Sequence, residues 1–178
     1  MAGVVDLVNE TAERLEAMPS DVTAATALAY AHTGFGALTL AAAVLSGQAS
    51  SARASELAAI NLAVVAAHED IAAVVDEQLL DDVIDTRVIE LLEDAENLPR
   101  IRASARYLRE AAMRTVTATR VVLTDLAAAQ EIPAPLREAI AEAGSIVDDI
   151  HILLDGPAHL RSALAEDYYE RVIVQSGE

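Results

Sequence analysis

Apolar residues recur every three or four positions along most of the chain, the spacing that places them on one face of an α-helix. No alternation of apolar and polar residues persists long enough to indicate a β-strand. The pattern predicts helices over residues 4–18, 22–45, 51–80, 82–95, 100–130, 133–155 and 158–172. Short connections between long amphipathic helices favour antiparallel neighbours. We therefore expect an all-α fold, an antiparallel up-and-down helical bundle of six or seven helices, formed by a single domain over residues 1–178.

Proline and small polar residues mark the predicted helix ends. Pro19 ends the first helix, and Ser20 or Asp21 caps the second. Pro133 and Pro135 suit the first turn of the helix that they open, because proline lacks an N–H that the helix would otherwise have to satisfy. These signals make the connections short, as an antiparallel bundle requires.

Residues 22–52 carry no charged side chain, although Asp21 precedes them and Arg53 follows. Their length suffices to cross a bilayer, which takes about 20 apolar residues. Ala, Thr, Ser and Gly are frequent, however, and no basic residue flanks the N-terminal side to orient insertion. The segment predicts a buried central helix, in which Gly34 and Gly36 permit a close helix contact or mark a kink. His32 would be a buried polar group that needs a partner.

The 178 residues are 53% hydrophobic but only 3% aromatic, so the core must consist of Ala, Val, Leu and Ile. With no Trp and a single Phe, the chain lacks the stacking platforms of nucleic-acid binding. The absence of Cys excludes disulfides and thiolate metal sites. Residues 1–17 lack the basic start of a signal peptide, and we expect a cytoplasmic protein. The net charge of −17 disfavours direct binding to nucleic acid or to an anionic membrane.

Charge is sorted along the chain. Residues 69–96 contain eleven acidic residues and one Arg, whereas residues 100–120 contain six Arg and one Glu. We call residues 81–96 the acidic surface and residues 102–120 the Arg ridge. Their predicted contact residues are Asp81, Asp82, Asp85, Glu93, Arg102, Arg106, Arg109 and Arg120.

The acidic surface and the Arg ridge can attract each other, either within one chain or between two chains. Exposed ion pairs contribute only about 0–1 kcal/mol each, so such contacts select partners more than they stabilise the fold. The sequence therefore predicts a non-enzymatic protein–protein interaction or assembly subunit without a cofactor, as a homo-oligomer or with another protein subunit. A third function compatible with the acidic surface is a mimic of nucleic acid that inhibits a basic partner.

Asp148, His151 and Asp155 follow one flank of a predicted helix, at i, i+3 and i+7. A carboxylate and an imidazole one turn apart can share a divalent metal ion. The pattern resembles the Glu-x-x-His element of ferritin-like proteins, with Asp148 in place of Glu, and departs from it because no second such element exists. The main interpretation is a polar edge of an amphipathic helix. The alternative is a metal-dependent helical-bundle enzyme or metal carrier that uses these three residues.

Two further short patterns carry less weight. Asp81, Asp82 and Asp85 resemble the magnesium–diphosphate motif of isoprenoid synthases, but over five residues only. His68 and Glu69 resemble the His–acid pair of phosphotransfer helices. By helical angle, however, His68 belongs to an apolar stripe, which favours a core histidine hydrogen-bonded across the bundle.

Overall fold

The computed structural model describes residues 3–72, 103–129 and 131–177. These residues form helices and no strand, which confirms the predicted all-α class. The helices of the described chain are α1 (Val4–Glu16), α2 (Ala24–Ser46), α3 (Ser51–Ala72), α6 (Ala105–Ala128), α7 (Ala134–Asp155) and α8 (Ala158–Ser176). The predicted helix over residues 82–95, and the break before it, lie outside the described residues.

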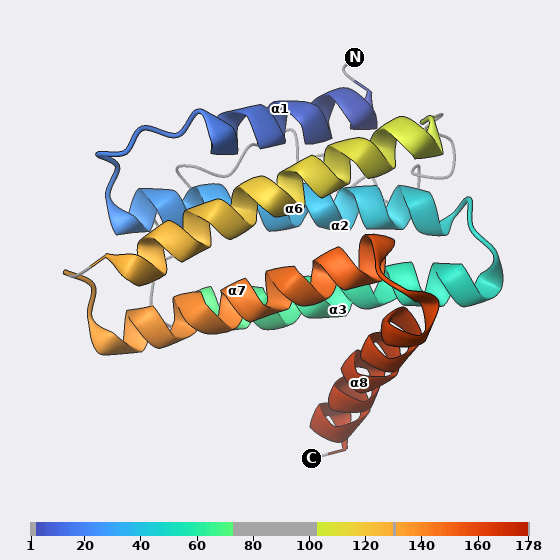
Figure 1. Ribbon diagram of the computed structural model, residues 1–178. Helices are drawn as coiled ribbons and strands as arrows, with labels where there is room; N and C mark the ends of the chain where they lie inside the picture. The colour runs from blue at the N-terminus through green and yellow to red at the C-terminus, as the bar shows by residue number, and fades with distance from the viewer. Residues whose placement is uncertain (1–2, 73–102, 130, 178) are drawn as a thin grey trace.

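Helices α2, α3, α7 and α6 form a ring in which each helix packs against its two neighbours, and neighbours run antiparallel (Figure 1). Helix α1 lies on one side of this ring, against α2 and α6. Helix α8 lies on the opposite side, where it contacts α3 and α7 and then leaves the bundle at an angle (Figure 1). The arrangement confirms the antiparallel bundle that short connections predicted.

Several helix ends differ from the prediction, among them the start of α6 at Ala105 instead of residue 100. The side chain of Thr23, and not that of Ser20 or Asp21, caps α2, because its Oγ1 accepts a hydrogen bond from the N–H of Thr26 at 3.2 Å. Helix α8 continues to Ser176 instead of ending near residue 172, because no glycine interrupts it before Gly177.

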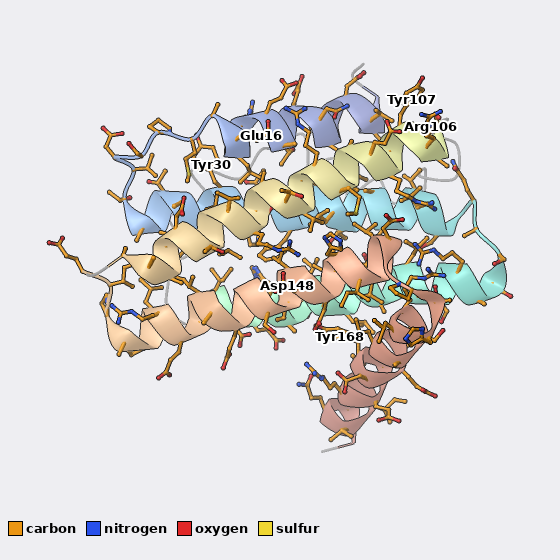
Figure 2. All side chains as sticks on the ribbon, in the orientation of Figure 1. Glu16, Tyr30, Arg106, Tyr107, Asp148 and Tyr168 are labelled. Carbon is orange, nitrogen blue, oxygen red and sulfur yellow. The ribbon has the colours of Figure 1, made fainter. Side chains whose placement is uncertain are left out.

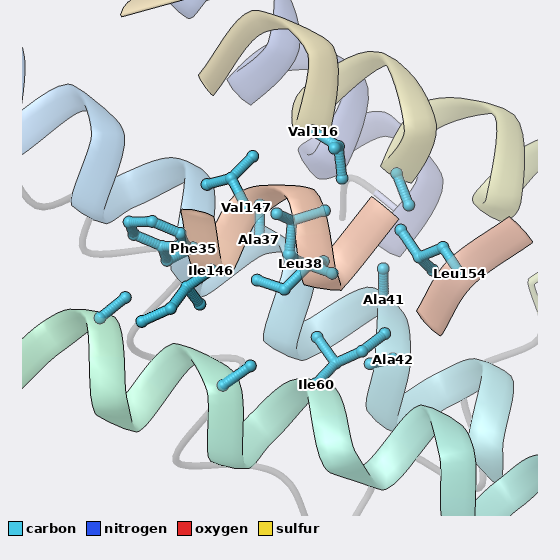
Figure 3. Close-up of a cluster of buried hydrophobic side chains, with 14 of the residues drawn as sticks. Phe35, Ala37, Leu38, Ala41, Ala42, Ile60, Val116, Ile146, Val147 and Leu154 are labelled. Atoms are coloured by element: carbon cyan, nitrogen blue, oxygen red, sulfur yellow. The ribbon is translucent and has the colours of Figure 1, made fainter. Parts of the chain in front are cut away.

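The charge-free helix α2 lies at the centre of the bundle. By length and composition alone it could span a membrane, yet 72% of its most apolar stretch is buried inside the structure. Figure 3 shows Phe35, Leu38 and Ala41 of α2 among apolar side chains of the other helices, including Ile60 of α3 and Val147 of α7. The burial agrees with the predicted central core helix.

Gly34 allows α2 to approach its neighbours closely. A Cβ atom at this position would lie 2.5 Å from Oγ1 of Thr119 in α6 and 3.1 Å from Cδ1 of Leu15 in α1. Thr119 is fully buried, and its hydroxyl donates to the carbonyl of Thr115 at 2.8 Å. The close helix contact predicted at Gly34 is therefore present, where α1, α2 and α6 meet.

Candidate functional site

A buried carboxylate organises the junction of α3, α7 and α8. Glu56 of α3 is only 8% exposed. Its Oε2 accepts from Nε of Arg161 at 2.8 Å and from Nη1 of Arg53 at 3.1 Å, and its Oε1 accepts from the hydroxyl of Ser162 at 2.9 Å. We call these four residues the Glu56 cluster. Two arginines and a hydroxyl thus satisfy the buried charge, as a buried carboxylate requires.

The arginines of the Glu56 cluster also cap α7. Arg53 donates to the carbonyl of Leu153 at 2.7 Å and to that of Leu154, and Arg161 donates to the carbonyl of Gly156 at 2.6 Å. Carbonyls at a helix C-terminus have no intrahelical partner and carry partial negative charge. The guanidinium groups therefore satisfy the end of α7 while they tie the first turn of α8 to α3.

Two opposing effects, burial and hydrogen bonding, set the pKa of Glu56. Burial raises it, but the hydrogen bonds from Arg161, Ser162 and Arg53 together outweigh burial and hold the pKa below its ordinary value. The carboxylate is consequently ionised at neutral pH. Because these donors stabilise the ionised form, the Glu56 cluster holds the first turn of α8 against α3.

A groove of about 390 Å³ lies between α3, α7 and α8. In its wall the hydroxyl of Tyr168 donates to Oδ2 of Asp149 at 2.8 Å (Tyr168 is labelled in Figure 2). Burial, and then the bond to Asp149, raise the pKa of Tyr168. The guanidinium of Arg171 lies 5.0 Å from the centre of the Tyr168 ring and pairs with Asp167 at 2.6 Å. No sequence motif indicated this groove.

The three predicted metal ligands have different surroundings in the structure. Oδ1 of Asp148 lies 2.6 Å from Nε of Arg120 in α6 (Asp148 is labelled in Figure 2), and Asp155 is exposed. His151 is half-buried, and its Nδ1 has no hydrogen-bond partner. Within the described ranges, no three His, Asp or Glu side chains come together as ligands for one metal ion. The metal site stays a prediction, and Asp148 joins α7 to α6 in this state.

The described part of the Arg ridge is divided among three environments. Arg114 pairs with Glu16 of α1 at 2.5 Å. Arg106, which is labelled in Figure 2, pairs with Glu110 in the same helix at 3.1 Å, and 82% of its side chain is exposed. Arg109 is exposed as well, whereas Arg120 is half-buried against α7. The remaining predicted contact residues, Arg102, Asp81, Asp82, Asp85 and Glu93, lie outside the described residues. Whether the ridge pairs within or between chains therefore stays open.

The two histidines that the sequence singled out are partners. Nε2 of His32 in α2 lies 2.6 Å from Nδ1 of His68 in α3. The predicted hydrogen bond across the bundle is confirmed, but the predicted core position of His68 is wrong: it is exposed, because it lies at the edge of the stripe that packs on α2. Burial and then the neighbouring His68 lower the pKa of His32 to about 4. The ring of His32 is therefore neutral at neutral pH, and one of the two ring nitrogens donates to the other.

The described residues thus form a helical bundle with the Glu56 cluster and a groove at its α8 side. The chain matches no protein-family model, and neither a curated protein nor a solved structure matches it. A functional assignment must therefore come from the surfaces themselves.

Proposed function

We propose that this chain is a non-enzymatic assembly subunit that joins copies of itself through the C-terminal part of α8. The observation that carries the proposal is the exposure of three consecutive apolar residues there. Val172 is 40% exposed, Ile173 70% and Val174 68%. Three adjacent β-branched apolar side chains in water favour association, because burying them removes apolar surface from water.

The position of α8 supports the same proposal. The helix is anchored near its beginning by the Glu56 cluster and extends away from the ring toward the C-terminus (Figure 1). Beyond Tyr168 the residues of α8 are half-buried or exposed. A helix that projects from a bundle can pack against a second copy without disturbing the core of either.

Charge provides a second contact in this proposal, between the Arg ridge of one subunit and the acidic surface of another. The two contacts respond to salt in opposite directions. Salt screens exposed charges, with a Debye length of about 10 Å at 0.1 M, and so weakens ion pairing between subunits. It also screens the repulsion between two chains of net charge −17 and so favours an apolar contact.

Sedimentation equilibrium at about 0.05 M and about 1 M salt tests the proposal. We expect a dimer or larger assembly that strengthens with salt, and we expect the Ile173→Gln/Val174→Gln variant to remain a monomer. Val121→Gln is the control, because Val121 of α6 is 54% exposed but lies on another helix. A strict monomer at both salt concentrations would contradict the proposal, and so would equal loss of assembly in the control.

The metal-dependent alternative retains one observation in its favour, the buried Nδ1 of His151 that has no hydrogen-bond partner. Imidazole nitrogen is a good ligand for zinc and related metals. Native mass spectrometry of protein purified without chelator tests this alternative. It requires a stoichiometric metal ion that the His151→Gln variant does not hold, and a metal-free wild-type protein would exclude it.

A further inference from the structure

The groove between α3, α7 and α8 combines an apolar floor with an exposed apolar lip. Leu62 and Ala66 of α3 and Ile146 of α7 line it and belong to or pack against the hydrophobic core. Val65 of α3 stands at its edge and is 55% exposed. Val172 of α8 lines the opposite wall. An apolar side chain that entered the groove would therefore contact aliphatic groups on both walls.

Carboxylates surround this apolar floor. Glu69 and Asp70 of α3 and Glu142 of α7 line the groove, and no described cation pairs with them. The basic residue in the lining, Arg171, is already paired with Asp167. The groove is consequently negative around its rim, although its floor is apolar.

This charge selects between possible occupants. One possible occupant is α8 of a second copy of the chain. The exposed surface of that helix is itself acidic, with Glu166, Asp167 and Glu170 exposed. Like charges brought together across an interface disfavour association. An occupant with apolar side chains on one face and basic side chains beside them would satisfy both the floor and the rim. An amphipathic helix rich in Arg or Lys has this pattern, with apolar anchors at i, i+3, i+4 and i+7.

We propose that the groove between α3, α7 and α8 binds a basic amphipathic helix of another protein. Its apolar side chains pack on Leu62, Val65 and Val172, and its Arg or Lys side chains pair with Glu69, Asp70 and Glu142. The inference rests on the proposed interaction role and adds a partner of defined chemistry. Of the three residues of the proposed self-contact, Val172 lines the groove, whereas Ile173 and Val174 do not, and substitutions at Ile173 and Val174 therefore test the self-contact separately.

The binding of a fluorescent amphipathic peptide of about 18 residues, Leu on one face and Arg on its flanks, tests the proposal with the full chain. Its twin carries Glu in place of every Arg. We expect the Arg peptide to bind and the Glu peptide not to bind. The Glu69→Gln/Asp70→Asn/Glu142→Gln variant should weaken binding about tenfold, because it removes three charge pairs without adding repulsion.

Two matched controls separate groove binding from general attraction to an acidic protein. The Asp21→Asn/Asp125→Asn/Glu131→Gln variant removes the same charge from exposed positions outside the groove and should bind the Arg peptide like the wild type. For the apolar contact, Val65→Thr should weaken binding about threefold, whereas Val121→Thr, at a similarly exposed position on α6, should not.

Equal losses in the groove and control charge variants would overturn the inference, because they would mean attraction to net charge alone. Failure of the Arg peptide to bind would overturn it too. Self-assembly measured by sedimentation reports separately on Ile173 and Val174, so either proposal can fail while the other stands.

Discussion

The two outer helices of the bundle are held in different ways. Helix α1 buries six of its residues, Val4, Leu7, Val8, Thr11, Ala12 and Leu15, against α2 and α6. Helix α8 is longer, yet its buried residues are Ala165 and Tyr168. Polar contacts compensate on that side, through the Glu56 cluster and the bond from Tyr168 to Asp149. Apolar burial makes α1 part of the core, whereas charged contacts hold α8 by one end and leave the other end exposed.

This difference has a physical consequence for function. A fully buried apolar stripe, such as that of α1, cannot contact another protein unless the bundle unfolds. A helix held by a local cluster of ion pairs and hydrogen bonds can expose apolar residues beyond that cluster and still keep its place. For this reason both contacts that we propose lie on the α8 side.

The largest expected effect is on the α1 side. Leu7 is 1% exposed, and Leu7→Ala should lower the free energy of unfolding by about 3–5 kcal/mol, because it removes buried methyl groups and leaves a cavity. Urea denaturation monitored by circular dichroism measures this change. The exposed Leu160→Ala on α8 is the comparison, and an equal loss there would contradict the difference between the two helices.

On the α8 side, Glu56→Gln should cost about 1.5–3 kcal/mol, because hydrogen bonds to a charged group are lost while two arginines remain. The loss should concentrate in α8. The pKa of Glu56 lies below its ordinary 4.5, so its contribution is complete above about pH 4.5 and disappears as pH falls through the lowered pKa. Denaturation of wild type and variant across this range should converge in acid. A constant difference would argue against an ionised Glu56.

A pair of glycine substitutions tests close packing. Gly34→Ala should destabilise by about 1–3 kcal/mol, because the new Cβ meets the buried Thr119 and Leu15. Gly144→Ala in α7 should instead stabilise by about 0.5–1 kcal/mol, because nothing lies within 4 Å of its Cβ and Ala is the better helix former. Thermal unfolding of both variants measures the signs. Two changes of the same sign would refute the close contact.

The smallest expected effect is that of Tyr168→Phe, about 0.5–1.5 kcal/mol, because it removes one hydrogen bond and keeps the ring in place. Tyr169→Phe is the control, since that hydroxyl donates to the carbonyl of Ser55 from an exposed position. Denaturation should show the larger loss for Tyr168. If Tyr169→Phe cost more, the bond to Asp149 would not contribute to holding α8.

Apolar periodicity sufficed to predict the all-α fold, because α1, α3, α6 and α7 each bury an apolar face and α2 is apolar nearly all round. The close contact at Gly34 was predictable for a related reason, since a small residue in an apolar helix permits approach. The cap at Thr23 was missed because Ser20, Asp21 and Thr23 are all chemically suited to cap. Only the backbone geometry decides among them.

The polar contacts were harder to predict because they join residues that are distant in sequence. Glu56 and Arg161 have no local pattern that marks them, and their partnership depends on the angle at which α8 leaves α7. The sorted charges predicted contacts between the acidic surface and the Arg ridge. In the described residues, Arg106 and Arg120 instead contact Glu110 and Asp148. Charge sorting in sequence thus did not indicate the groove, whose acidic rim comes from two separate helices.

Hydrogen exchange of the intact chain, followed by mass spectrometry, tests the difference between α1 and α8 most directly. Amide exchange reports the free energy of local opening, segment by segment. We predict that α8 opens at a lower free energy than α1, and that Glu56→Gln speeds exchange in α8 while α1 keeps its protection. Equal protection of the two helices, or faster exchange in both helices of the Glu56→Gln variant, would contradict the difference between α1 and α8.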